Sequence, residues 1–177
     1  LPYQVNFSAG VQRELRGDLF VEAAYVGNRG RRLLWRPDIN QPTFEALAAN
    51  AALPSPQSVN ALRPYAGYSA IQQLQSDAVS NYNALQLYLT RRQGALRFTA
   101  GYTLAKAMTD ASGNSDDPED PFNRAFNYGP ASFDRRHVLV TTYTYELPWL
   151  QGRRDLLAMV AAGWEISGIT RWQSGQY

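Results

Sequence analysis

The side chains most suited to chemistry in this sequence lie around its only histidine. His137 follows Asp134 by three residues. A serine, a histidine and an aspartate can form a nucleophilic triad, but no serine here sits in the glycine-framed turn that such a nucleophile needs. With no cysteine and one histidine, the sequence also lacks the ligands of a zinc site. The segment Gly27-Asn28-Arg29-Gly30 lacks the spacing and the following helix of a phosphate loop. We therefore expect no catalytic residue, no cofactor and no enzyme activity.

Acidic residues gather between positions 109 and 134, which suggests calcium as a second possible chemistry. Calcium binds six to eight oxygens, and carboxylates commonly supply them. The candidate ligands are Asp116, Asp117, Glu119 and Asp120. Their spacing differs from that of an EF-hand, which needs oxygen ligands at alternate positions around a central glycine. A solvated acidic loop is the favoured interpretation, with a calcium site as the alternative.

Composition narrows the class of protein further. The 177 residues carry a net charge of +2, and the basic residues, Lys106 and otherwise arginine, are scattered along the chain. Nucleic-acid binding would favour a basic cluster with interleaved aromatics, so no nucleic-acid partner is expected. The longest apolar stretch, from Leu156 to Trp164, is shorter than the ~18 residues of a membrane-spanning helix. A mean hydropathy of −0.40 with 12% aromatic residues fits strands in which every second residue is polar.

The clearest structural signal is a β-hairpin between Asn81 and Lys106. Apolar and polar residues alternate through both arms, as they do on the two sides of a strand. Residues 92–95 separate the arms, and Gly94 can adopt the positive φ of a tight reversal. The simplest register that pairs apolar with apolar residues places Leu89 opposite Phe98 and Leu87 opposite Ala100.

The same alternation predicts four further strands, joined by connections of alternating length. The strands cover residues 3–11, 19–25, 138–147 and 164–172, and strand character resumes near Ala70 before the hairpin. Short turns are expected at 16–18, 92–95 and 149–155, and long loops at about 35–68 and 109–134. The first long loop contains a short helix capped by Thr43 and running through Leu53. Outer-membrane barrels distribute turns and loops in this way, with turns on the periplasmic side and loops outside.

We therefore predict an all-β, antiparallel up-and-down meander of about six long strands. Residues 1–177 would form part of one transmembrane β-barrel domain, without a plug, and we expect the chain to be a fragment because about six strands are too few to close a natural barrel. Tyr143, Tyr145, Trp149 and Trp164 are candidates for an interfacial aromatic girdle.

Parity along each strand assigns side chains to the lipid or to the barrel lumen. The predicted lipid-facing residues are Val5, Phe7, Leu85, Leu87, Leu89, Phe98, Ala100, Tyr102, Tyr143, Tyr145, Trp164 and Ile166. The predicted lumen-facing residues are Gln86, Tyr88, Thr90, Arg97, Thr99, Glu146 and Glu165.

Five segments in order also resemble the C-terminal barrel of TonB-dependent outer-membrane receptors of the Oar-like kind. They are AAYVGNRGRRL from Ala23, SNYNALQLYLTRR from Ser80, FTAGYTLAKAMTD from Phe98, FDRRHVLVTTYTYELPW from Phe133 and GWEISGITRWQSGQY from Gly163. The resemblance implies a Gram-negative outer-membrane barrel of about 22 strands, closed by an N-terminal plug, that binds or imports a bulky ligand. The implied partners are outer-membrane lipid, the remaining barrel strands, the plug domain, and TonB acting through an N-terminal region outside this chain.

Two other hypotheses remain open from the sequence. One is a soluble β-sandwich that binds carbohydrate on Trp35, Trp149, Trp164 and Trp172. The other is an outer-membrane surface barrel or adhesin that does not transport.

Overall fold

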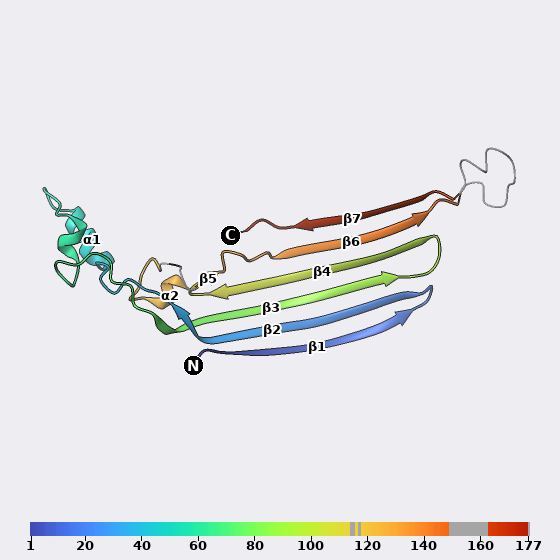
Figure 1. Cartoon of the computed structure of the whole chain (residues 1–177), viewed down its shortest axis with the longest axis horizontal. Helices are drawn as coiled ribbons and strands as arrows, with labels where there is room; N and C mark the ends of the chain where they lie inside the picture. The colour runs from blue at the N-terminus through green and yellow to red at the C-terminus, as the bar shows by residue number, and fades with distance from the viewer. Residues whose placement is uncertain (114–115, 117, 149–162, 177) are drawn as a thin grey trace.

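Six long strands lie side by side in one antiparallel sheet (Figure 1). The computed structural model describes residues 1–113, 116, 118–148 and 163–176. The sheet order is β1-β2-β3-β4-β6-β7, and a two-residue strand, β5, pairs with the end of β4. The strands are β1 (Tyr3–Leu15), β2 (Leu19–Trp35), β3 (Gln75–Arg91), β4 (Leu96–Thr109), β5 (Gly129–Pro130), β6 (His137–Glu146) and β7 (Glu165–Gln173). The predicted all-β meander is confirmed.

Short and long connections lie at opposite ends of the sheet (Figure 1). The β1–β2 turn uses Gly17 and Asp18 with φ of 80° and 57°, and the β3–β4 turn uses Gly94 with φ of 87°. The opposite end carries the helices α1 (Phe44–Ala51) and α2 (Arg124–Asn127) and the 3-10 helix η1 (Val59–Leu62). The turn predicted at residues 149–155 lies outside the described residues.

The predicted hairpin register is wrong by two residues. Leu89 lies opposite Ala100, Leu87 opposite Tyr102, and the last pair of the hairpin is Arg91 with Phe98. Strand β4 extends past that pair because its first residues bond to β6, where Leu96 lies opposite Tyr145. A shift of two residues leaves every side chain on its original face, so the predicted faces survive the error.

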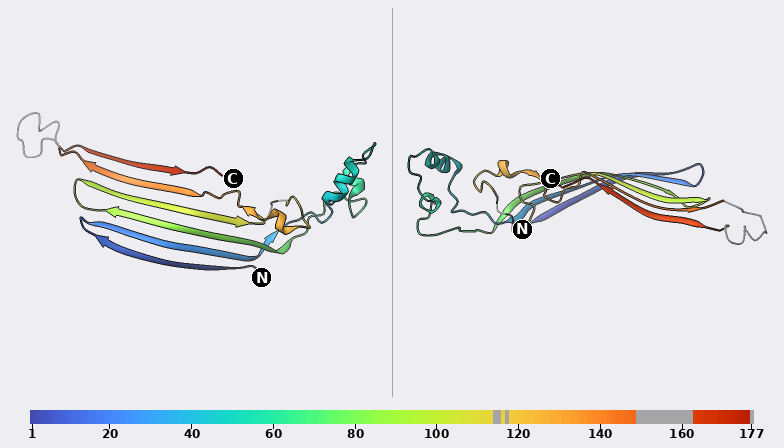
Figure 2. Two further views of the ribbon diagram at one scale, coloured as in Figure 1. Left: turned by 180° about the vertical axis from the view of Figure 1, so that it is seen from behind. Right: turned by 90° about the horizontal axis from the view of Figure 1, so that it is seen from above.

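The sheet is a single layer, which rules out the soluble sandwich. Figure 2 shows the strands edge-on, and no second sheet covers either face among the described residues. Leu85 and Leu87 are each 41% exposed. In a sandwich these leucines would be packed against an inner face of the other sheet. Trp35 also could not serve as a carbohydrate platform, because it is only 1% exposed.

Helix α1 forms behind its predicted cap but ends at Ala51, two residues before the predicted Leu53, and β3 starts later than expected. The Thr43 hydroxyl accepts a hydrogen bond from the Ala46 amide at 3.2 Å and caps the helix. Strand β3 begins at Gln75, five residues after Ala70, because the preceding segment makes only an isolated bridge between Asp38 and Gln72. Within the described chain, no helix is long and apolar enough to cross a bilayer.

Candidate functional site

The pairing of strands collects most of the large apolar residues of the six long strands on one surface, which we call the apolar face. Leu89 of β3 pairs with Val21 of β2 on one side and with Ala100 of β4 on the other. Phe98, the neighbour of Ala100 on the same face of β4, pairs with Tyr143 of β6. The register places on this face all twelve residues predicted to face lipid, with Trp164 following by parity just before β7. That lipid contacts them remains a prediction.

Aromatic rings on the apolar face cover two glycines and form one cluster at the long-loop end. A β-carbon on Gly27 would clash with the Phe7 ring, and one on Gly168 would lie 2.7 Å from the Tyr143 hydroxyl. Rings that cover glycines on neighbouring strands help to fix strand register. His137 pairs with the Tyr102 hydroxyl through Nδ1 at 2.7 Å and lies 6.2 Å from the Trp172 ring. His137 is therefore a member of this aromatic cluster.

The opposite surface, the polar face, carries the seven residues predicted to line the lumen. At its short-turn end the Arg97 guanidinium bridges Glu146 at 2.8 Å and Glu165 at 3.1 Å. Thr90 and Thr99 share a hydrogen bond of 3.1 Å. One cation with two carboxylates leaves this end of the polar face locally acidic and well hydrated, since the three side chains are 43–46% exposed.

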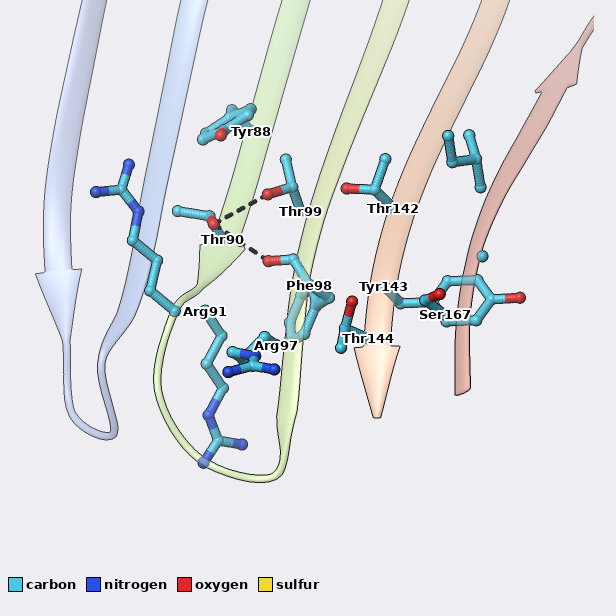
Figure 3. A pocket seen from close by; sticks show the side chains of 13 residues that line it. Tyr88, Thr90, Arg91, Arg97, Phe98, Thr99, Thr142, Tyr143, Thr144 and Ser167 are labelled. Carbon is cyan, nitrogen blue, oxygen red and sulfur yellow. Dashed lines mark hydrogen bonds between the residues drawn. The ribbon is translucent and has the colours of Figure 1, made fainter. Parts of the chain in front are cut away.

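A shallow depression of about 540 Å³ lies at the short-turn end of the sheet (Figure 3). Thr90 and Arg97 border it from the polar face, whereas Phe98 and Tyr143 belong to the apolar face. Because residues from both faces border it, the depression is an open hollow at the end of a single-layered sheet, and it cannot enclose a ligand.

The second long loop is held to the sheet by a charge network around Arg124, in which the Asp110 carboxylate is buried. Its guanidinium forms ion pairs with Asp110 and, at 2.8 Å, with Asp77, and it lies 5.0 Å above the Trp35 ring. The indole of Trp35 donates to Asp77. The Asp110 carboxylate, whose side chain is 2% exposed, also accepts from the Val79 amide at 2.8 Å. The network fixes the second long loop to the ends of β2 and β3.

A second network organises the first long loop internally. The fully buried Asn40 amide donates to the carbonyls of Ser69, Tyr65 and Tyr68, and its oxygen accepts from the Tyr65 amide. Burial disfavours the charged form of Asp38. Bonds from the Ile71 and Asn40 amides and from Arg63 outweigh burial, so the pKa of Asp38 lies below its usual value.

The calcium candidates make local turn contacts. Asp116 accepts from the Gly113 amide, and Asp120 accepts from the amides of Phe122 and Asn123. Glu119 contributes its backbone carbonyl to Gln41. No group of three potential ligands converges anywhere in the described chain, while Asp117 lies outside it. The geometry therefore offers no support for the calcium hypothesis.

Comparison with protein families decides the class. A family model described as an outer membrane beta barrel domain matches residues 1–177. The chain belongs to this family. No curated protein and no solved structure matches it. An outer-membrane β-barrel domain places the protein in the bacterial outer membrane, where an uncovered apolar face is expected to meet hydrocarbon.

Sequence reasoning missed the residues that organise the long loops. The sequence pattern singles out neither Asp110 nor Arg124. Their partners lie on β2 and β3, far away in the sequence, so no local spacing signals the contact. One signal was available in the strands: Arg29 and Lys106 fall on the apolar face by parity, where a charge is unusual.

Proposed function

We propose that this outer-membrane barrel domain is part of the wall of a TonB-dependent receptor that binds or imports a bulky ligand. The proposal adds a plug, energy coupling and a ligand to the barrel role that family membership gives. It assigns the chain a binding and transport role without catalysis. The plug, TonB and the remaining strands are its proposed protein partners.

The observation that carries the proposal is the openness of the six-strand sheet. Strands β1 and β7 form opposite edges and do not approach pairing with each other (Figure 1). An eight-stranded barrel would be nearly closed after six strands, because barrel diameter grows with strand number. A sheet that stays open over six long strands fits a wide barrel, and wide barrels of about 22 strands enclose a plug.

The composition of the polar face supports the same proposal. It presents ion-paired and hydroxyl side chains, including Arg97, Glu146, Glu165, Thr90 and Thr99. Such groups suit a surface that meets a hydrated lumen or a polar plug. The second long loop, held to the strands by Arg124, suits an outer surface that holds a ligand in a defined position.

The test is site-specific photocrosslinking in the full-length protein in its own membrane. A photoreactive residue at Gln86 or Thr99 should crosslink to a segment of the same polypeptide, the plug. The same residue at Leu87 or Ala100, one position away on the apolar face, should give no such product. In parallel, the full-length protein should be captured by the periplasmic domain of TonB.

Failure of both arms would overturn the receptor proposal and leave the outer-membrane barrel intact. The result would then favour a surface barrel or adhesin. One feature suits that alternative: Phe44 of α1 and Phe126 of α2 form an edge-to-face pair at 5.6 Å that remains largely exposed at the loop end.

A further inference from the structure

The apolar face is charged at its two ends, and its charges there are basic. Arg13 and Arg91 occupy the short-turn end, and Arg29, Arg31 and Lys106 occupy the long-loop end. The strand carboxylates of Glu14, Glu22, Glu146 and Glu165 point to the polar face. The remaining one, Asp77 of β3, is paired with Arg124. A face whose free charges are all positive is complementary to an anionic layer.

At the long-loop end two guanidinium groups converge on a single neutral oxygen. Arg29 Nη1 donates to Asn81 Oδ1 at 3.0 Å, and Arg31 donates to the same atom from Nη1 and Nη2, each at 3.3 Å. The Asn81 amide nitrogen donates to the Tyr128 hydroxyl at 2.6 Å, which fixes the orientation of the oxygen. None of the described carboxylates forms an ion pair with Arg29 or Arg31.

This arrangement needs an external anion more than the other charged sites do. Two like charges held side by side repel each other, and a neutral amide oxygen offsets little of that repulsion. Elsewhere in the described chain, Arg63, Arg97 and Arg124 each have a carboxylate partner. Guanidinium forks match the oxygens of phosphate and form paired, charge-assisted hydrogen bonds with it.

The backbone around the pair is shaped to bring Arg31 into this position. Strand β2 has a bulge between Gly30 and Leu33, and Arg32 within it has a φ of 54°. Bulges interrupt regular pairing and redirect side chains. Beside the bulge, Arg31 bonds to the Gly30 carbonyl at 2.7 Å and reaches across to the Ser80 carbonyl at 3.2 Å. These bonds hold the guanidinium against the sheet.

The surface next to the two arginines is suited to acyl chains. Val5 lies opposite Arg29, and Phe7 and Tyr25 follow toward the middle of the sheet, their rings 6.1 Å apart. Val5 is 51% exposed and Phe7 is 39% exposed. On β4, Lys106 lies opposite Asn83 on the same face. Its side chain is exposed and forms no hydrogen bond or ion pair with any described residue.

We propose that Arg29, Arg31 and Lys106 form a binding site for the phosphate groups of a multiply phosphorylated lipid in the outer leaflet. The long loops of a barrel of this class face outward, so the site lies at the level of that leaflet's headgroups. The acyl chains would lie along the strip that begins at Val5 and Phe7. The site depends on outer-membrane location and is independent of whether the barrel transports a ligand.

The experiment measures lipid binding by native mass spectrometry of the full-length protein in detergent. The probes are diphosphorylated lipid A and the same lipid with both phosphates removed. The double variant Arg29→Gln/Arg31→Gln should bind the diphosphorylated lipid about tenfold more weakly, because charge-assisted bonds to phosphate are lost. Its affinity for the dephosphorylated lipid should not change.

Two further variants keep the test decisive if the double variant folds poorly. Lys106→Gln removes one cation from an exposed side chain with no partner, and should weaken binding of the diphosphorylated lipid about threefold. Arg171→Gln removes an exposed arginine from the polar face, next to Val140 on β6, and should change nothing. Wild-type protein that binds both lipids equally, or Lys106→Gln and the double variant both binding like wild type, would overturn the proposal.

Discussion

The sheet of this protein exposes large apolar side chains, whereas its loop end buries polar ones. In the sheet, large apolar residues such as Val11, Leu85 and Ile166 are exposed, at 75%, 41% and 53%. At the loop end, the nearly or fully buried side chains include the polar Asn40, Asp110 and Asp134 beside Trp35. Most of the buried residues of the described chain therefore lie where the ends of the strands meet the long loops.

The difference shows which surroundings stabilise each part. Backbone hydrogen bonds between neighbouring strands satisfy the sheet's amides, but its apolar side chains gain little from other parts of this chain. We expect lipid to bury them. The loop end lies in water and supplies its own packing and ion pairs, so it responds to the loss of internal contacts. Substitutions can therefore separate stability that comes from lipid from stability that comes from internal contacts.

The largest effect should come from placing a charge on the apolar face. Leu87→Arg should destabilise the folded barrel by about 2–4 kcal/mol in a bilayer, the cost of a cation facing mid-membrane lipid. Gln86→Arg, its neighbour on the polar face, should cost far less. Urea unfolding of the full-length protein in lipid vesicles, followed by tryptophan fluorescence, measures both. Equal losses would contradict the assignment of the two faces.

Removing the cation at the centre of the loop network should have the next largest effect. Arg124→Met leaves the buried Asp110 carboxylate without its charge partner. We expect a local loss of about 2 kcal/mol, below the 3–5 kcal/mol of a fully buried pair because Arg124 is 31% exposed.

Amide hydrogen exchange of the full-length protein detects this loss. Protection of Val79 and of the segment around Asp110 should fall about 30-fold, while the middle of β3 should be unchanged. Arg171→Met, on the polar face of β7, is the matched control and should leave the loops protected. Faster exchange throughout the sheet would show that the loop end and the sheet are one cooperative unit.

A smaller effect is expected at the cap of α1. Thr43→Ala removes the side-chain acceptor for the Ala46 amide and should destabilise this short helix by about 1 kcal/mol. Proteolytic cleavage between residues 44 and 52 should become several-fold faster. Thr43→Ser keeps the hydroxyl and should behave like wild type. Cleavage that stays at the wild-type rate in Thr43→Ala would mean that η1 and its neighbours, rather than the cap, hold the helix.

The smallest effect should be the response of the first long loop to acid. The pKa of Asp38 is lowered, so its ionised form stabilises the folded loop. That stabilisation is complete above the unfolded carboxyl pKa of about 3.9 and is lost as the pH falls through the lower folded value.

Pepsin cleavage of the loop should therefore distinguish wild type from Asp38→Asn at a pH of about 4 and above, and the two rates should converge only as the pH falls below the lowered folded pKa. Comparing the two proteins at each pH removes the pH dependence of the protease. A constant difference down to the lowest pH would show that Asp38 stays ionised there or acts through its shape alone.

Much of the sheet could be predicted because strand alternation is a local property. The faces of Leu87 and Gln86 follow from parity, and Gly94 marks the β3–β4 reversal. The exact register could not be predicted. Shifting β3 against β4 by two residues preserves both faces, and the choice depends on how Leu96 and Arg97 pair with β6. The loop contacts were equally hidden, since Arg124 meets Asp77 only after the second long loop has folded back onto the sheet.

The sequence by itself determined the strands, their two faces, and the alternation of short turns with long loops, because period-two patterning and turn residues act over a few neighbouring positions. Only the tertiary structure decided the stagger between strands, the burial of Trp35 and Asp110 under Arg124, and the meeting of Arg29 with Arg31 at Asn81. Those features depend on which distant backbone segments lie side by side, and hydrogen bonding across the whole sheet sets that arrangement.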